Sequence, residues 1–149
     1  MQNQWVRRLM AVFVVLSLTL GLAACGGVKD TTIPPPPGGT EVKEGDDANL
    51  DLFISFVKPA LEQEVAKENG QVDKQAIYTT STPVADVVKF YSDTMKANGW
   101  NESTNQAGAD GSTSLGYDSG KNAAVIYISD GSALGIDGTF VMAINLSKK

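Results

Sequence analysis

The sequence predicts an α+β fold in which one or two helices pack on an antiparallel β-meander. Two observations support this prediction. Apolar residues recur at helical spacing within residues 50–65 and 84–95, and from residue 100 onward they alternate with polar residues at period two. Helices that precede a run of consecutive strands are typical of the α+β class. About 100 residues from Leu50 onward are enough for one modest core.

The start of the chain has the parts of an export signal. Arg7 and Arg8 supply a positive charge, and residues 9–22 follow without any charge. This apolar stretch has 14 residues, which fits the roughly 7–15 of a signal peptide. It falls short of the ~20 residues that cross a bilayer comfortably. We therefore expect residues 1–24 to be a signal peptide, with an uncleaved membrane anchor as the less favoured alternative.

Leu22-Ala23-Ala24-Cys25 follows this apolar core directly, and Cys25 is the only cysteine of the chain. These residues resemble the lipobox of bacterial lipoproteins, in which leucine and two small residues precede an invariant cysteine. The resemblance implies cleavage between Ala24 and Cys25 and a diacylglycerol thioether on the Cys25 sulfur. Two or three acyl chains on one cysteine hold a domain stably at a membrane. We expect a protein of the cell envelope, lipid-anchored on the extracytoplasmic face of a membrane.

Residues 25–47 are expected to form a flexible tether that begins with the lipidated cysteine. Gly, Pro, Thr and acidic residues dominate it, and such a composition buries too little apolar surface to offset chain entropy. Residues 34–37 are four consecutive prolines, which should form a short polyproline II rod. Two alternatives remain open. The prolines could dock in an aromatic groove, or residues 39–42 could pack as an edge strand of the domain.

The remaining residues, 48–149, are predicted to form a single α+β domain with two helices. Asp46, Asp47 or Asn49 caps the first helix, which Pro59 should kink. Thr82 is the predicted cap of the second helix, with Pro83 in its first turn and Gly99 at its end. The apolar stripe is Leu50, Phe53, Ile54, Val57, Leu61 and Val65 in the first helix, and Val84, Val87, Val88, Tyr91 and Met95 in the second.

One strand is predicted between the helices and a meander after them. The predicted strands are residues 75–80, 100–104, 113–118, 123–129 and 139–147. In the last strand Phe140 and Met142 lie on one face, and Val141 and Ala143 lie on the other. An exposed apolar face around Val141 and Ala143 would indicate a docking surface.

This order of elements is similar to that of helix-grip domains, which often bind partners or apolar ligands. Ile77, Phe90-Tyr91 and Asn98-Gly99-Trp100 also resemble small exported domains with a strand, a helix, a Gly-Trp corner and a meander. No activity attaches to that second group, and fold analogy by itself carries little functional weight.

The residues that carry most enzyme chemistry are missing. The chain has no histidine, which is the commonest general base and metal ligand, and its cysteine is assigned to lipid. We expect no catalytic residues, no metal, no cofactor and no enzyme activity. Ser55-x-x-Lys58 and residues 116–121 lack the companion residues of a catalytic or phosphate-binding motif. Four aspartates bracket two glycine-rich stretches, Asp110 and Asp118 the first and Asp130 and Asp137 the second, and they are expected to serve turns.

The charge of the chain excludes another class of partner. Cleavage of the signal peptide removes both arginines, so that ten lysines face 17 acidic residues and the net charge is −7. Phosphate backbones require a basic face, and we therefore expect no nucleic acid.

Three functions remain, in decreasing order of preference. The first is an envelope lipoprotein whose non-catalytic domain binds an unidentified protein partner or acts as an accessory subunit. The second is a small-ligand-binding module with an aromatic-lined cavity between helix and sheet. The third is a glycan hydrolase, which needs two carboxylates about 5–10 Å apart. The candidate contact residues for a ligand or partner are Tyr78, Tyr91, Trp100, Tyr117 and Tyr127.

Overall fold

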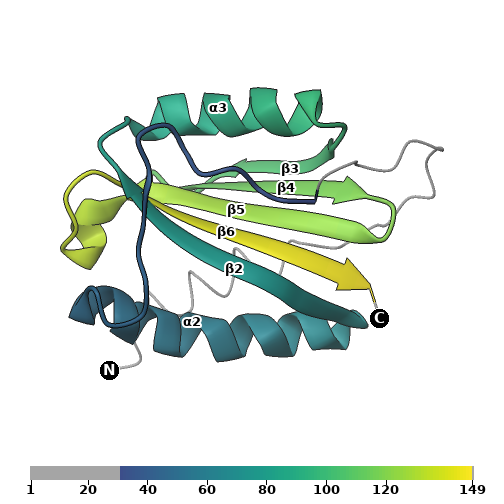
Figure 1. The fold of residues 1–149 in the computed structure, drawn as a ribbon, viewed down its shortest axis with the longest axis horizontal. Helices are drawn as coiled ribbons and strands as arrows, with labels where there is room; N and C mark the ends of the chain where they lie inside the picture. Colours follow the sequence, from purple (N-terminus) through teal and green to yellow (C-terminus); the bar gives the residue numbers. More distant parts are fainter. Residues whose placement is uncertain (1–30, 149) are drawn as a thin grey trace.

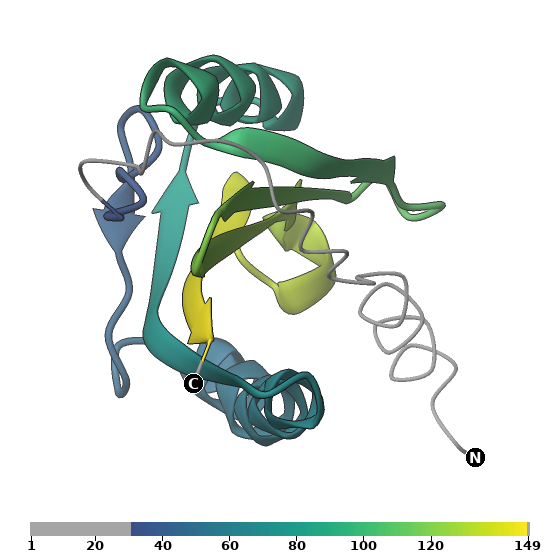
Figure 2. The same cartoon turned by 90° about the vertical axis from the view of Figure 1, so that its right-hand side faces the viewer.

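The protein has three layers, with a six-stranded antiparallel sheet between two helices (Figures 1 and 2). The structure is a computed structural model that describes residues 31–148. The predicted signal peptide and the cleavage and lipidation site at Ala24 and Cys25 lie outside the described residues. The elements are β1 (Thr40–Glu41), α2 (Ala48–Lys67), β2 (Gly70–Thr80), α3 (Val84–Ala97), β3 (Asn101–Ala107), β4 (Thr113–Ser119), β5 (Asn122–Asp130), the 3-10 helix η1 (Gly131–Leu134) and β6 (Thr139–Lys148).

The strand order β1-β2-β6-β5-β4-β3 explains how the sheet is built. Strands β3 to β6 form the predicted meander, in which each strand pairs with the next. β2 then pairs antiparallel with β6, from Gly70 opposite Lys148 to Thr80 opposite Thr139. The predicted α+β class, with two helices on an antiparallel sheet in a helix-grip-like arrangement, is confirmed.

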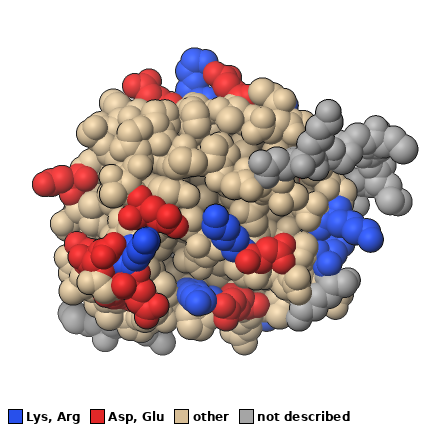
Figure 3. Space-filling view, in the orientation of Figure 1, with Lys and Arg blue, Asp and Glu red and all other residues tan. Residues whose placement is uncertain are grey.

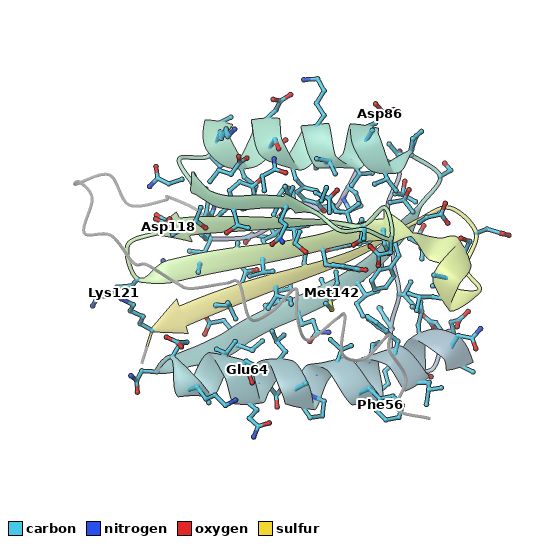
Figure 4. All side chains as sticks on the ribbon, turned by 180° about the vertical axis from the view of Figure 1, so that it is seen from behind. Phe56, Glu64, Asp86, Asp118, Lys121 and Met142 are labelled. Atoms are coloured by element: carbon cyan, nitrogen blue, oxygen red, sulfur yellow. The ribbon has the colours of Figure 1, made fainter. Side chains whose placement is uncertain are left out.

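One face of the sheet is covered by α2, which runs as a single helix through Pro59. Of the three predicted caps, Asp47 is used, because its Oδ1 accepts the N–H groups of Asn49 (2.8 Å) and Leu50 (3.1 Å). Met142 is 2% exposed on the sheet face toward this helix, whereas Phe56 points away from the sheet and is 69% exposed (Figure 4). The apolar stripe of α2 therefore closes one half of the core.

The other face of the sheet is covered in part by α3, which lies over β3, β4 and β5. Its predicted cap was wrong, because Pro83 occupies the cap position without a side-chain hydrogen bond. The Thr82 hydroxyl instead donates to the Pro37 carbonyl at 3.0 Å. The predicted end is confirmed: Gly99 has φ of +88°, and the Trp100 N–H donates to the Met95 carbonyl at 3.0 Å.

The rest of this face is covered by residues 31–37, which we call the strap. Ile33 is 5% exposed and shares a core cluster with Ala76, Tyr78 and Val141. The Asn145 side chain on β6 donates to the Thr31 carbonyl. Figure 1 shows this segment running across the sheet below α3 before it turns down beside β2.

The strap corrects the predicted boundary of the flexible tether at residue 47. Val141 and Ala143 are 0% and 3% exposed, and they belong to the same core cluster as Ile33 of the strap. The alternative placement of residues 39–42 as an edge strand is confirmed in its central part, since Thr40 and Glu41 form β1 and pair with β2. No helix within residues 31–148 is both long and apolar enough to span a membrane.

Candidate functional site

The aromatic residues predicted as ligand contacts do not come together as one set. Four of them belong to the core cluster on the α3 side of the sheet: Tyr78, Tyr91, Trp100 and Tyr117. Tyr127 lies on the α2 side, where its ring centroid is 6.4 Å from that of Phe140. None of the five is more than 9% exposed. In this state the five side chains are core residues and offer no surface to a ligand.

Burial also changes the chemistry of the tyrosine hydroxyls. It raises the pKa of Tyr91, and it raises the pKa of Tyr117 to about 12 with an added contribution from the nearby Glu102 carboxylate. The Tyr91 hydroxyl donates to the Pro34 carbonyl at 3.0 Å, and thereby holds the strap. The Trp100 indole N–H has no acceptor among residues 31–148. These groups are neutral hydrogen-bond donors throughout the physiological range.

An open groove of about 460 Å³ lies elsewhere, between α2, the edge of β2 and the segment that follows β1. Ile54, Lys58 and Glu62 line it from α2, because residues four apart lie in one row along a helix. Residues 72–77 of β2 line the opposite side. The volume falls within the range of roughly 300–1,000 Å³ typical of ligand pockets.

The groove exists because β1 is short. The Val42 N–H donates to the Ile77 carbonyl at 2.9 Å, and the chain then leaves the sheet. It turns toward α2 through a loop in which the Lys43 N–H donates to Asp46 Oδ2 at 2.8 Å. Among residues 31–148, no strand pairs with β2 on this edge from Gly70 to Ala76.

Charges of both signs surround the groove (Figure 3). The lysines are Lys43, Lys58 and Lys74, and the acids are Glu41, Glu44, Glu62 and Asp73. None of the three lysines forms an ion pair within the described part of the chain, where the ion pairs lie at Lys67, Lys89 and Lys96. The ammonium groups at the groove are therefore available to a ligand.

The floor of the groove has apolar side chains and an amide that are only partly used in contacts among residues 31–148. Val42, Ile54 and Val72 are only partly buried against the α2-side core. The buried Gln75 Oε1 accepts no hydrogen bond from residues 31–148, and Gln75 Nε2 lies 3.7 Å from the Met142 sulfur. A ligand could cover the apolar side chains and reorient this weakly held amide.

Two aspartates of the glycine-rich loops accept hydrogen bonds within turns, as predicted. Asp130 Oδ1 accepts the Ser132 N–H at 2.8 Å, and hydrogen bonds from Ser132 lower the pKa of Asp130. Asp110 Oδ1 accepts the Ser112 N–H at 3.1 Å and the Ser112 hydroxyl at 2.6 Å. Within residues 31–148, no cluster of three or more acidic or other metal-binding side chains is arranged to hold a metal ion.

Sequence reasoning missed the groove because it placed the start of β2 too late. The strand was predicted from Gln75, but it begins at Gly70. Residues 71–74 are mostly polar, which is unusual for a strand between two covered faces and typical of a sheet edge. That polar run was the available signal.

The family profile that matches this chain is that of the START domain-like family, over residues 61–136. The match covers just over half of the 149 residues, and the chain belongs to this family. The matched segment runs from the second half of α2 through η1, while the strap and β1 precede it. No curated protein and no solved structure matches the chain.

Proposed function

We propose that this START-like protein is a non-catalytic binding domain, held at the extracytoplasmic face of a membrane by lipid on Cys25. The groove between α2 and β2 is its ligand site. The lipobox residues and the apolar stretch before them support the anchor. The single observation that supports binding at this place is an open, charged groove with partly buried apolar side chains.

The groups around the groove suit recognition more than catalysis. They are lysines and carboxylates, with no histidine anywhere in the chain. Lys43, Lys58 and Lys74 are all exposed, so their charges are solvated and can select a ligand by complementarity. General acid–base chemistry usually relies on a titratable group whose pKa is tuned by burial.

The anchor is tested by replacing Cys25 with serine. The wild-type chain should fractionate with membranes and carry a diacylglycerol mass on an N-terminal Cys25. Cys25→Ser should remove that mass and release the protein from the membrane fraction. An unmodified Cys25 thiol, or an intact signal peptide, in the wild-type protein would show that the anchor is wrong.

Binding at the groove is tested with a photoreactive amino acid in place of Lys58. The matched control carries the same amino acid in place of Lys89, whose side chain is 75% exposed on α3 and lies away from the groove. Irradiation of cells should give a discrete cross-linked product from position 58 and not from position 89. Equal products, or none at position 58, would contradict a ligand site at the groove.

A second candidate function has its own supporting observation. The strap seats Ile33 on an apolar surface that includes Tyr78 and Val141, so displacement of the strap would uncover a site for an apolar ligand. Ile33→Ala should then increase binding of a fluorescent fatty acid, relative to the wild type, while the circular dichroism spectrum stays unchanged. Unchanged fatty-acid binding would remove this candidate.

A further inference from the structure

We infer that the groove binds an extended peptide segment of a partner protein, which adds to the free edge of β2 as a further antiparallel strand. This inference rests on the proposed function, because it specifies the ligand class of the same site. The argument concerns the backbone of β2, the space beside it and the side chains around that space.

The backbone of β2 presents unpaired groups to the groove. In an antiparallel ladder, alternate residues point their N–H and C=O groups toward the same edge. The Ile77 carbonyl points toward β1, since it accepts the Val42 N–H at 2.9 Å. Gln75, two residues away, therefore points its N–H and C=O toward the same edge, where β1 has already ended. A polypeptide backbone is the ligand that matches this donor and acceptor pattern.

The length of the site is set at both ends. One end is Val42, where the chain leaves the sheet, and the other is the irregularity in pairing between Val72 and Lys74. At that irregularity, Asp73 Oδ1 accepts hydrogen bonds from the Gln71 side chain and the Ser147 hydroxyl, both at 2.9 Å. Residues 73–76 of β2 lie between these two ends. A peptide strand beside them rises by the same amount, about 3.4 Å per residue, so the site accommodates about four residues of peptide.

The side chains around the groove define the chemistry of that peptide. Successive side chains of a strand point to opposite faces. Those on the α2 side would meet the partly buried Ile54 and Val72, which favours apolar residues at alternate positions. The charged side chains of both signs at the rim, such as Lys58 and Glu62, disfavour a peptide of one charge sign. The fitting partner is a mixed-charge segment with alternating apolar residues.

The experiment uses the full chain purified in detergent and a phage-displayed library of random nine-residue peptides. Selected peptides should show apolar residues at alternate positions. Binding of a selected synthetic peptide should slow hydrogen–deuterium exchange at residues 72–76 of β2 and not at β3, which is the opposite edge strand. Failure to select any peptide above background would overturn the inference.

Two substitutions separate strand addition from other modes of binding. Gln75→Pro removes an N–H that faces the groove, a position where a sheet tolerates proline, and should weaken peptide binding about tenfold. Gln75→Ala keeps that N–H but lacks the side-chain amide, so the loss of peptide affinity from Gln75→Ala to Gln75→Pro measures the backbone N–H alone. N-methylation of alternate peptide amides should abolish binding in one register and leave it unchanged in the other. This peptide series decides the question even if Gln75→Pro fails to fold.

The remaining outcomes also discriminate. Equal effects of N-methylation in both registers would overturn strand addition. So would concentration-dependent dimerisation that protects β2 without any peptide, since a second copy would then be the occupant. If position 58 still gives its specific cross-linked product while the peptide experiments fail, the proposed binding function stands and only the strand-addition mode is wrong.

Discussion

The two faces of the sheet differ in how completely other segments cover them. On the α3 side, the strap covers the part of the sheet that the helix leaves bare, and Ile33 is 5% exposed. On the α2 side, the edge of β2 is left without a neighbouring strand for most of its length, and a groove of about 460 Å³ remains. The comparison shows that short segments outside the main elements decide where this domain is closed and where it is open.

Proline chemistry explains why the strap can close a sheet face without joining the sheet. Prolines have no N–H group, so a proline segment lying on the sheet needs donors only for its carbonyls. Thr80 Oγ1 donates to the Pro37 carbonyl at 2.7 Å, and Tyr91 donates to that of Pro34. The groove, by contrast, keeps both donors and acceptors of β2 available.

The largest expected effect tests the closed side. Ile33→Ala should lower the free energy of unfolding by about 2–4 kcal/mol, because it leaves a cavity beneath the strap. Leu52→Ala, on the solvent side of α2 where Leu52 is 60% exposed, is the control and should change stability by no more than ~0.5 kcal/mol. Urea unfolding measures both. Equal, negligible effects would mean that the strap is as free as the tether was predicted to be.

Alkaline pH tests the same side through its tyrosines. Burial raises the pKa of Tyr91 and holds that of Tyr117 near 12, while the unfolded chain ionises near 10.0. The contribution of these two tyrosines to the free energy of unfolding is complete below pH 10. It is lost as the pH rises toward 12, because in that range only the unfolded state releases the phenolic proton. The loss is about 1.4 kcal/mol per pH unit for each such tyrosine. Urea unfolding at several pH values should show it, and a flat profile up to pH 12 would contradict tight burial.

A smaller effect is expected for the hydrogen bond that holds the strap. Tyr91→Phe should lower the free energy of unfolding by about 1 kcal/mol, because the Pro34 carbonyl loses its hydrogen-bond donor. In the double variant with Ile33→Ala, the free energy of unfolding should fall by less than the sum of the two single effects, since both substitutions loosen the same segment. Strict additivity in urea unfolding would argue that Ile33 and Tyr91 act independently.

The smallest effect is expected on the open side. Lys58→Ala and Lys74→Ala should each change the free energy of unfolding by less than ~0.5 kcal/mol, because neither lysine has an ion-pair partner in residues 31–148. Thermal unfolding is the appropriate measurement. A loss of several kcal/mol in either variant would make these lysines structural and would weaken the case for a ligand site.

Local patterns predicted the helices and the meander well. The apolar stripe of α2, the Gly99 corner after α3 and the alternation of β6 are all signals between residues close in sequence. The two misplacements have one cause. Thr82 fits a helix cap locally, but its hydroxyl is used by Pro37, which is 45 residues away. The strap likewise looks like a tether in isolation, and only the uncovered surface of Val141 and Ala143 gives Ile33 a place to pack.

The sequence by itself determined the α+β class, the order of the elements and, through the residues around Cys25, the expectation of a lipid-anchored protein. These depend on local periodicity and on a short contiguous motif. The tertiary structure alone decided that the tyrosines are enclosed, that residues 31–37 complete the core and that the edge of β2 is open. Those features depend on contacts across the sheet between segments that are far apart in the sequence. Neither composition nor periodicity encodes such contacts.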